Sequence, residues 1–355
     1  MLATKQELML DRNKDIKDFV DEFTDGARNR NRYRREIEEI LKGLDNGLAL
    51  DQIRIYANRE FKPFEMEQIR LGLEHGLSEE QVKVYAKPEF SFIQMVEIRT
   101  GFEHGLTVEQ VSVYAKPEFT ACDLDYGNDN QMKEIRRGLE CGLTMEQVKF
   151  YAHPEINFLL MESLWKGFEH GVSIEQIRPF VEKGLDFALV KEACLGFEHG
   201  LTAEQVEFYA APKFSPNLGG ASNQLEQIRL GFEHGLTMEQ IEVYANPEFK
   251  WPQMREVREG FESGLTLEQV GYYAKPEFNS LQMQEIRKGF AEGLSMEQVK
   301  AYADPRDDFE KMAEIREGLK IGKYAVISPS EEKFNPMDFD LEKLTDIIEE
   351  EKNGK

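Results

Sequence analysis

Histidine and glutamate recur side by side between two glycines along this chain. The heptapeptide GFEHGLT occurs three times, beginning at Gly101, Gly196 and Gly231, and close variants such as GLEHGLS, which begins at Gly72, occur elsewhere. Histidines at a fixed interval could ligate metal ions, and a histidine beside a carboxylate could transfer protons. A histidine just before a glycine could instead lie at the end of a helix. The spacing of the copies helps to choose among these chemistries.

The motif and its variants follow a fixed period. Seven of the nine intervals between their first glycines are 29 residues long, and the other two are 37 and 35. A fixed period indicates one supersecondary unit that is repeated many times. The first glycines are Gly43, Gly72, Gly101, Gly138, Gly167, Gly196, Gly231, Gly260, Gly289 and Gly318.

Five of the six histidines share one position of the repeat, directly before its second glycine. Equivalent residues of stacked helices lie about 10 Å apart, whereas the ligands of a zinc ion lie about 2 Å from it. A shared metal therefore fits poorly, and we expect no metal or other cofactor. The position favours a capping role at a helix C-terminus, with a functional ladder as the alternative. The five residues are His75, His104, His170, His199 and His234.

Each copy is predicted to begin with a helix of about three to four turns. In one copy Met95, Ile98 and Phe102 are spaced three and four residues apart, which places them on one buried stripe. Gly105 is expected in the left-handed conformation that ends such a helix, with Leu106 folding back against it. The spacing of the two glycines, four residues apart, also indicates close packing at this end of the helix.

A second helix of about two turns is predicted to follow. Thr107 is placed as its N-cap, and Gln110 completes the capping box. The tyrosine that recurs near its end, Tyr114 in this copy, falls at core spacing, although a stacking platform for bases or peptides is an alternative. Lys116 precedes a proline, so the helix is expected to end there.

These predicted helices are too short to be stable without neighbouring copies. The sequence therefore predicts an all-α fold, a superhelical solenoid of about ten two-helix repeats over residues 29–322 with terminal caps, and leaves its handedness open. Residues 1–28 are expected to form an N-terminal leader or cap with a helix near 15–23. Residues 323–355 are an acidic C-terminal cap or tail, and insertions lie near 120–130 and 215–223.

The repeat resembles the helix-turn-helix solenoid class that includes tetratricopeptide, HEAT and armadillo repeats. Within it, MQEIRKGFAEGLSMEQVKAY at residues 283–302 is similar to the tandem repeats EIRxGLExGLSxEQVxxYAxPEF of uncharacterised proteins from gut Firmicutes, their mobile elements and phages. That resemblance implies a helical repeat fold and a bacterial or phage origin, and no activity.

Composition indicates a folded, acidic protein. The net charge is −23, yet 41% of the residues are hydrophobic, which suffices for a sizeable core. Such a charge disfavours direct binding to nucleic acid, and a protein partner with a basic surface is the better match. The three cysteines, Cys122, Cys141 and Cys194, suggest reduced thiols. No stretch has the length of a membrane span, so we expect a cytoplasmic protein that binds no membrane.

The recurring glutamates have two interpretations. They could form a solvated face with ion pairs such as Arg99 with Glu103, four residues apart. They could instead form an extended negative surface that enters a basic groove of another protein.

Departures from the repeat are predicted to mark the binding surface, because stacking does not require them. The arginine of the repeat becomes Trp165 and Cys194 in two central copies, and Phe180 replaces the tyrosine of one copy. A local bend with compensating packing and an apolar anchor for a partner are both open. The two insertions add candidate partner-binding residues, because loops on a scaffold often carry recognition: Asp123, Asp125, Tyr126 and Asp129 in the first, and Asn217 and Leu218 in the second.

A basic cluster begins the repeat region. It either neutralises acidic neighbours or contacts phosphate or an acidic partner, and it consists of Arg28, Arg30, Arg32, Arg34 and Arg35.

No nucleophile, base or phosphate loop stands out from the repeat, so an enzyme is not predicted. The leading hypothesis is a non-catalytic protein-binding scaffold that uses the solenoid surface, the central copies and the inserted loops. The alternative is a phage or mobile-element inhibitor, whose acidic face occupies the basic nucleic-acid channel of a host defence nuclease.

Overall fold

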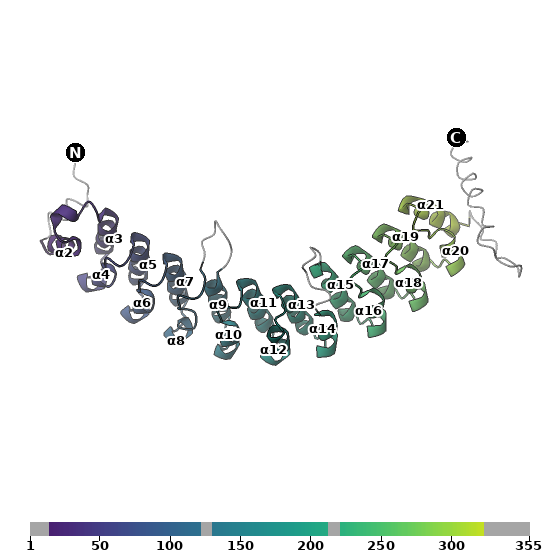
Figure 1. Cartoon of the computed structure of the whole chain (residues 1–355), viewed down its shortest axis with the longest axis horizontal. Helices are drawn as coiled ribbons and strands as arrows, with labels where there is room; N and C mark the ends of the chain where they lie inside the picture. Colours follow the sequence, from purple (N-terminus) through teal and green to yellow (C-terminus); the bar gives the residue numbers. More distant parts are fainter. Residues whose placement is uncertain (1–13, 122–129, 212–220, 323–355) are drawn as a thin grey trace, which may run out of the picture. The chain divides into compact units, whose positions relative to one another are not determined.

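The computed structural model describes residues 14–121, 130–211 and 221–322 (Figure 1). These residues form twenty α-helices, α2 to α21, and one 3-10 helix, η1, with no strand among them, so the predicted all-α class is confirmed. The chain divides into two compact units, Met1–Met238 and Glu239–Lys355. Each unit is described by itself.

In the first unit long helices alternate with short ones. Each long helix packs against the next long helix, and the short helices lie beside them in a second row (Figure 1). The long helices are α3 (Arg34–Asp45), α5 (Pro63–Glu74), α7 (Phe92–Glu103), α9 (Gln131–Glu140), α11 (Phe158–Glu169), α13 (Phe187–Glu198) and α15 (Ala221–Glu233). The short helices are α4 (Leu50–Tyr56), α6 (Glu79–Tyr85), α8 (Val108–Val111), α10 (Met145–Tyr151), α12 (Ile174–Glu182) and α14 (Ala203–Tyr209).

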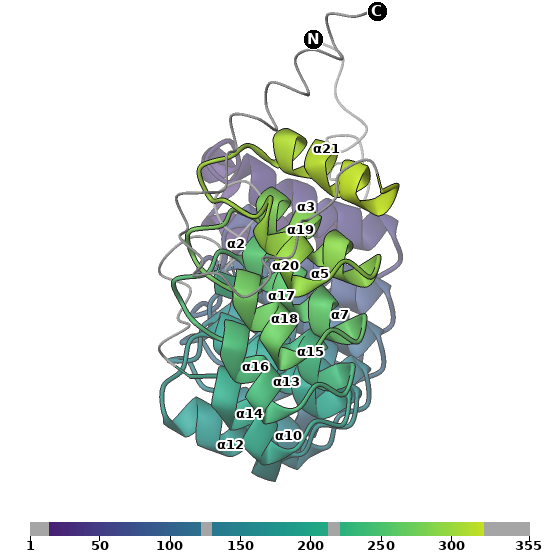
Figure 2. The same ribbon diagram turned by 90° about the vertical axis from the view of Figure 1, so that its right-hand side faces the viewer.

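The second unit repeats this alternation. Its long helices α17 (Trp251–Glu262), α19 (Ser280–Ala291) and α21 (Phe309–Lys320) pack one against the next, with α18 (Leu267–Tyr273) and α20 (Met296–Lys300) beside them (Figure 2). The short helix α16 (Met238–Tyr244) begins at the boundary between the units.

The predicted chain reversal between a long and a short helix is confirmed. Gly105 has a φ of 88°, and the amide of Leu106 donates to the carbonyl of Gly101 at 3.0 Å. The hydroxyl of Thr107 accepts from the amide of Gln110 at 3.2 Å, while the Thr107 amide donates to the Gln110 side chain at 2.9 Å. These reciprocal bonds satisfy backbone groups at the start of the short helix that would otherwise lack partners.

The first glycine of the motif makes room for the tyrosine of the short helix. Tyr114 is fully buried, as the core interpretation predicted, and its hydroxyl donates to the carbonyl of Glu97 at 3.4 Å. A Cβ on Gly101 would lie 2.0 Å from that hydroxyl oxygen. The glycine is therefore required because the tyrosine hydroxyl packs directly on the helix backbone.

Three short helices differ from the prediction, and one of them, α20, ends early at Lys300. α8 ends at Val111, well before Lys116, and the hydroxyl of Ser112 donates to the carbonyl of Val108 at 2.6 Å. Such a bond competes with regular helix geometry. α12 instead continues through Pro179 to Glu182, and is longer than the other short helices.

The helix predicted in the leader is present as α2 (Lys14–Thr24). It buries Ile16, Phe19, Val20 and Phe23. Nε of Arg59 donates to the carbonyl of Phe23 at 2.6 Å, which ties α2 to the first copy of the repeat.

Candidate functional site: the groove between α11 and α13

Successive long helices are joined by a row of side-chain pairs, which we call the polar ladder. The fourth residue before the first glycine of one copy accepts a hydrogen bond from the second residue before the first glycine of the next. From arginine Nε to the acceptor oxygen, the pairs are Glu39 with Arg70 (2.9 Å), Gln68 with Arg99 (3.3 Å), Glu97 with Arg136 (2.9 Å) and Glu192 with Arg229 (2.9 Å) in the first unit, and Glu256 with Arg287 (3.0 Å) and Glu285 with Arg316 (3.0 Å) in the second.

The ladder lies in the interior. Glu97 and Arg136 are buried, and Arg136 also donates to Glu140 on its own helix at 2.6 Å. The predicted ion pairs four residues apart therefore form, and Arg99 with Glu103 and Arg136 with Glu140 each join a largely buried arginine to an exposed glutamate. Burial raises the pKa of Glu192, against the opposing effect of its hydrogen bond from Arg229. Buried charges of this kind are tolerated only when they are paired.

The histidines connect one copy to the next. His104 occupies the predicted C-cap position of α7, and its Nδ1 lies 2.9 Å from a carboxylate oxygen of Glu140 on α9. The capping interpretation missed this partner, which belongs to the following copy. In the first unit the same contact joins His75 to Glu103, His170 to Glu198 and His199 to Glu233, at 2.7, 3.0 and 2.7 Å. Among the described residues, no group of three or more histidine, cysteine or acidic side chains could hold a metal ion.

The ladder changes at Trp165, which occupies an arginine position. The indole Nε1–H donates to a carboxylate oxygen of Glu134 at 2.8 Å, so a neutral donor replaces the guanidinium. Trp165 is only 8% exposed, and it fills the junction between α9 and α11. The substitution preserves the hydrogen bond across that junction.

At the next junction the ladder is interrupted. Its two positions are Ser163 on α11 and Cys194 on α13, and the hydroxyl of Ser163 donates within its own helix, to the carbonyl of Leu159 at 2.9 Å. Phe180 occupies the tyrosine position of this copy, and it has no hydroxyl to donate. The space next to Gly167 is taken by the thiol instead, since a Cβ there would lie 2.7 Å from Sγ of Cys194.

An open groove lies along this junction. It has a volume of about 350 Å³, which is within the range of small binding sites. Its floor includes Ser163, Gly167 and Cys194, and Leu159 and Phe187 line the same groove. We attribute the groove to side-chain size: serine and cysteine are much shorter than the glutamate and arginine that meet at regular junctions.

Charged side chains of both signs line the groove. Lys166 pairs with Glu162 at 2.5 Å, and His170 contacts Glu198 at 3.0 Å. Lys191 adds a further cation, so the lining is nearly balanced in charge although the whole chain carries −23. Burial raises the pKa of the Cys194 thiol to about 12. The thiol is therefore neutral near pH 7, which suits binding better than nucleophilic chemistry.

The structure separates the three central residues that were predicted to bind a partner. Trp165, Phe180 and Cys194 are all buried, at 8%, 2% and 4% exposure, and only Cys194 lines the groove. Their partner-binding role stays a prediction. The loop candidates Asp123, Asp125, Tyr126, Asp129, Asn217 and Leu218 lie outside the described residues.

Sequence reasoning missed most of the groove lining, including Lys166, Lys191 and Phe187. A signal was present in the repeat: the copy that loses its acceptor at Ser163 precedes the copy that loses its donor at Cys194. Reading the two positions as partners would have located the junction.

The arginine cluster is divided between η1, the following turn and the start of α3. Arg30 pairs with Asp21 of α2 at 2.6 Å, and Arg34 lies 3.3 Å from Glu38. Arg28, Arg32 and Arg35 are exposed. Two of the five arginines therefore face acidic neighbours.

The groove coincides with a departure from the repeat at both ladder positions, Ser163 and Cys194. It is an apolar cleft with charged edges between two packed helices, a form that suits the binding of a protruding side chain. None of the helices in the described ranges is long and apolar enough to cross a membrane. Comparison with protein-family models, with curated proteins and with solved structures finds no match to this chain.

Proposed function

We propose that this chain is a non-catalytic protein-binding scaffold, built as a superhelical solenoid of about ten two-helix copies over residues 29–322. The α11–α13 groove is its principal contact site. The observation that carries the proposal is the concerted loss of the ladder at Ser163 and Cys194, which coincides with the groove. A stack needs no such interruption, because the neighbouring junctions are filled.

The groove and the overall charge favour a particular kind of partner. A partner protein with a basic surface would be attracted by the net charge of −23. One apolar side chain of that partner would enter between Leu159 and Phe187, and displacement of water from apolar surface would supply most of the affinity. Lys166 and Glu198 at the edge would orient the contact.

Filling the groove tests the proposal. The double variant Ser163→Glu with Cys194→Arg restores the residue types of a regular ladder pair, and we expect it to remain folded but to lose the partner that the parent chain captures from a bacterial lysate. A second variant, Lys166→Ala, tests the edge of the groove and should weaken capture. Lys288→Ala is its matched control and should not, because both lysines occupy the same repeat position and only Lys166 lines the groove. Capture that survives groove filling would overturn this assignment.

The solenoid itself has a separate test. Ten copies at the usual helix spacing of about 8–10 Å give a length of about 80–100 Å. Small-angle X-ray scattering of the full chain should return a maximum dimension at least this large. A value expected for a compact sphere of this mass would contradict the solenoid while leaving the groove experiment interpretable.

A second candidate function rests on acids that the ladder does not use. Short helices carry an exposed glutamate in their first turn, where the helix dipole favours a negative charge: Glu80, Glu109, Glu146, Glu175 and Glu204 in the first unit, and Glu268 and Glu297 in the second. Such a row could occupy a basic nucleic-acid channel, as an inhibitor from a phage or mobile element would. Partner capture should then fall steeply as salt rises, whereas capture through the groove should persist.

A further inference from the structure

Glu198, at the edge of the α11–α13 groove, lacks the arginine that pairs with its counterparts in regular copies. There the arginine two residues before the first glycine pairs with the glutamate two residues after it, as Arg136 does with Glu140 at 2.6 Å. In the copy of α13, Cys194 replaces this arginine, four residues before Glu198. Among the described residues, the only ion-pair partner of Glu198 is His170, at 3.0 Å.

The space that this arginine would fill is open. In the next copy Arg229 also donates from Nε to the ladder acceptor Glu192, at 2.9 Å. At the α11–α13 junction Ser163 occupies the acceptor position, and Ser163, Cys194 and Glu198 all line the groove. Burial, and after it the charge of Glu198, raises the pKa of the Cys194 thiol, so the carboxylate lies near the position of the missing arginine.

The two lysines that line the groove do not replace this arginine. The ammonium group of Lys166 pairs with Glu162 on its own helix at 2.5 Å. Lys191 precedes Glu198 by seven residues, which is about 10 Å along the axis of α13. The carboxylate of Glu198 is therefore left for a cation that comes from outside the chain.

We propose that the Glu198 end of the groove binds an arginine side chain of the partner, in place of the arginine that Cys194 replaces. This inference rests on the proposed scaffold function and adds the chemistry of its partner. The guanidinium would donate to Glu198 and to the hydroxyl oxygen of Ser163, which can accept while its own hydrogen is donated to the carbonyl of Leu159. Leu195 lines the same groove and offers apolar surface to the arginine methylenes.

An arginine and an apolar side chain of the partner fit the groove together. Phe187 is the first residue of α13 and Glu198 is the last, so the two contacts lie toward opposite ends of that helix. A partner segment with both residue types also agrees with the basic surface that the net charge of −23 favours. Lysine suits the Glu198 end less well, because one ammonium group lacks the planar fork of donors that a guanidinium has.

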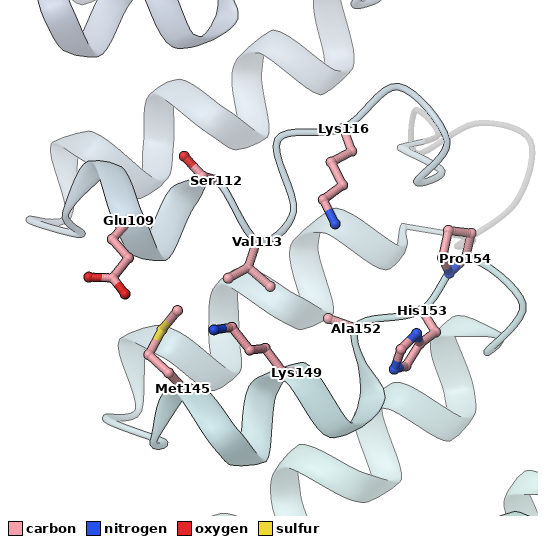
Figure 3. A pocket seen from close by; sticks show the side chains of 9 residues that line it. All are labelled: Glu109, Ser112, Val113, Lys116, Met145, Lys149, Ala152, His153 and Pro154. Carbon is pink, nitrogen blue, oxygen red and sulfur yellow. The ribbon is translucent and has the colours of Figure 1, made fainter.

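A second hollow supplies a comparison outside the ladder. It lies between α8 and α10 and has a volume of about 440 Å³. Its single acid, Glu109, lies at the far end from His153 (Figure 3). Glu109 is exposed and occupies no ladder position, so it provides a carboxylate beside a hollow that does not replace a ladder pair.

Nα-acetyl-arginine amide is the probe for the Glu198 end, because its use does not require a known partner. Ligand-detected NMR titration of the full chain should show saturable binding with a Kd of about 1 mM. The citrulline analogue keeps the shape of the side chain and lacks its charge. It should bind at least about fivefold more weakly, since the charge-assisted hydrogen bonds are lost. Equal affinity for the two compounds, or no saturable binding of the arginine probe, would overturn the proposal.

Variants of single glutamates locate the site. Glu198→Gln should weaken binding of the arginine probe at least about fivefold. Glu169→Gln is the matched control on α11, where Trp165 fills the place of the arginine, and Glu109→Gln is the control at the second hollow. Both controls should leave binding within about twofold. An equal loss in all three variants would mean a general effect of charge and no site.

The double variant Ser163→Glu with Cys194→Arg supplies the arginine from the chain itself, and it should abolish binding of the probe. Retained binding in this variant, with an unchanged circular dichroism spectrum, would place the probe elsewhere and reject the proposal.

The probe also separates this inference from the proposed function. Partner capture that is lost on filling the groove but is unchanged by Glu198→Gln would reject the arginine contact and keep the scaffold function. Saturable, Glu198-dependent binding of the probe to a chain that captures no partner would keep the arginine site and reject the scaffold function.

Discussion

Two junctions between long helices share one backbone arrangement but differ in the side chains at the ladder positions. They are the α7–α9 junction and the α11–α13 junction. The first is closed by Arg136, which donates to Glu97 across the interface and to Glu140 on its own helix. The second has Ser163 and Cys194 at the ladder positions and leaves a groove. The helices still pack side by side there, so the ladder is not what makes neighbouring helices associate.

This difference indicates what the ladder contributes. Apolar residues such as Ile98 and Ile135 are fully buried in the stripe of each long helix, and they supply association without direction. A buried carboxylate accepts only a donor at a defined position, so Glu97 with Arg136 favours one register between α7 and α9. At the α11–α13 junction that role falls to close packing of the Cys194 thiol near Gly167.

The largest expected effect comes from breaking one ladder pair. Arg136→Met removes the cation paired with the buried Glu97, which then keeps only the hydrogen bond from the Asn130 amide at 2.8 Å. We expect a loss of about 3–5 kcal/mol in the free energy of unfolding. Cys194→Ala removes only a small apolar group and should cost about 1 kcal/mol. Urea denaturation followed by circular dichroism compares the two. Equal costs would mean that the Glu97–Arg136 pair contributes no more to stability than the Cys194 thiol does.

The next largest difference in stability is expected between substitutions of the first glycines of two copies, Gly101 and Gly167. Gly101→Ala would place a Cβ 2.0 Å from the Tyr114 hydroxyl oxygen, whereas Gly167→Ala would meet the Cys194 thiol at 2.7 Å. We expect about 2–3 kcal/mol of destabilisation for the first change and about 1 kcal/mol for the second, because overpacking is costly where neighbours cannot move. Thermal unfolding midpoints of the two variants provide the measurement. A larger effect at Gly167 would contradict the close packing of the Tyr114 hydroxyl against Gly101.

Building a ladder pair into the groove gives a third test. Ser163→Glu and Cys194→Arg should each destabilise alone, because each adds one partly buried charge without its partner. Together they should show a favourable coupling of about 1–2 kcal/mol in a double-mutant cycle. Additive effects would show that the backbone at this junction does not permit the ladder geometry.

The smallest expected effect concerns pH. Burial raises the pKa of Glu103, but hydrogen bonds from His75 and Arg99 outweigh it, so the pKa lies below its usual value. Its contribution to stability is therefore full above about pH 5 and is lost as the pH falls through the lowered folded-state pKa. Glu103→Gln should flatten the dependence of the unfolding midpoint on pH between about 5 and 3.

Glu198 is the matched position at the groove. It contacts His170, but Cys194 replaces the arginine that would accompany it in a regular copy. Glu198→Gln should therefore lower the unfolding midpoint at neutral pH less than Glu103→Gln does, because it leaves no arginine without its acceptor. The reverse order would mean that the histidine contact contributes more to stability than the arginine contact does.

The local elements could be predicted from sequence because their signals are local. Gly105, Thr107 and Gln110 encode the reversal through backbone conformation and hydrogen bonds that span a few residues. The core spacing of Tyr114 likewise follows from helix periodicity. Two of the exceptions, α8 and α12, depart from the predicted bounds near Ser112 and Pro179.

The partners of the charged residues were not predictable in the same way. Arg99 was correctly paired with Glu103 on its own helix, but its bond to Gln68 connects residues 31 positions apart. His104 was placed correctly as a cap, and its partner Glu140 lies on the next long helix. Periodicity assigns a residue to a face of its helix, and it does not identify which residue of the neighbouring helix will oppose it.

The all-helical class, the glycine reversals, the capping boxes and the buried tyrosines could be predicted from the residues alone, since each depends on contacts within one copy. The packing of neighbouring helices determines which glutamate meets which arginine, that Trp165 substitutes for a guanidinium, and that Ser163 and Cys194 meet across an open groove. These outcomes depend on the distance and register between helices that are about thirty residues apart along the chain. Packing sets that geometry, because side chains from two copies must fill one shared space.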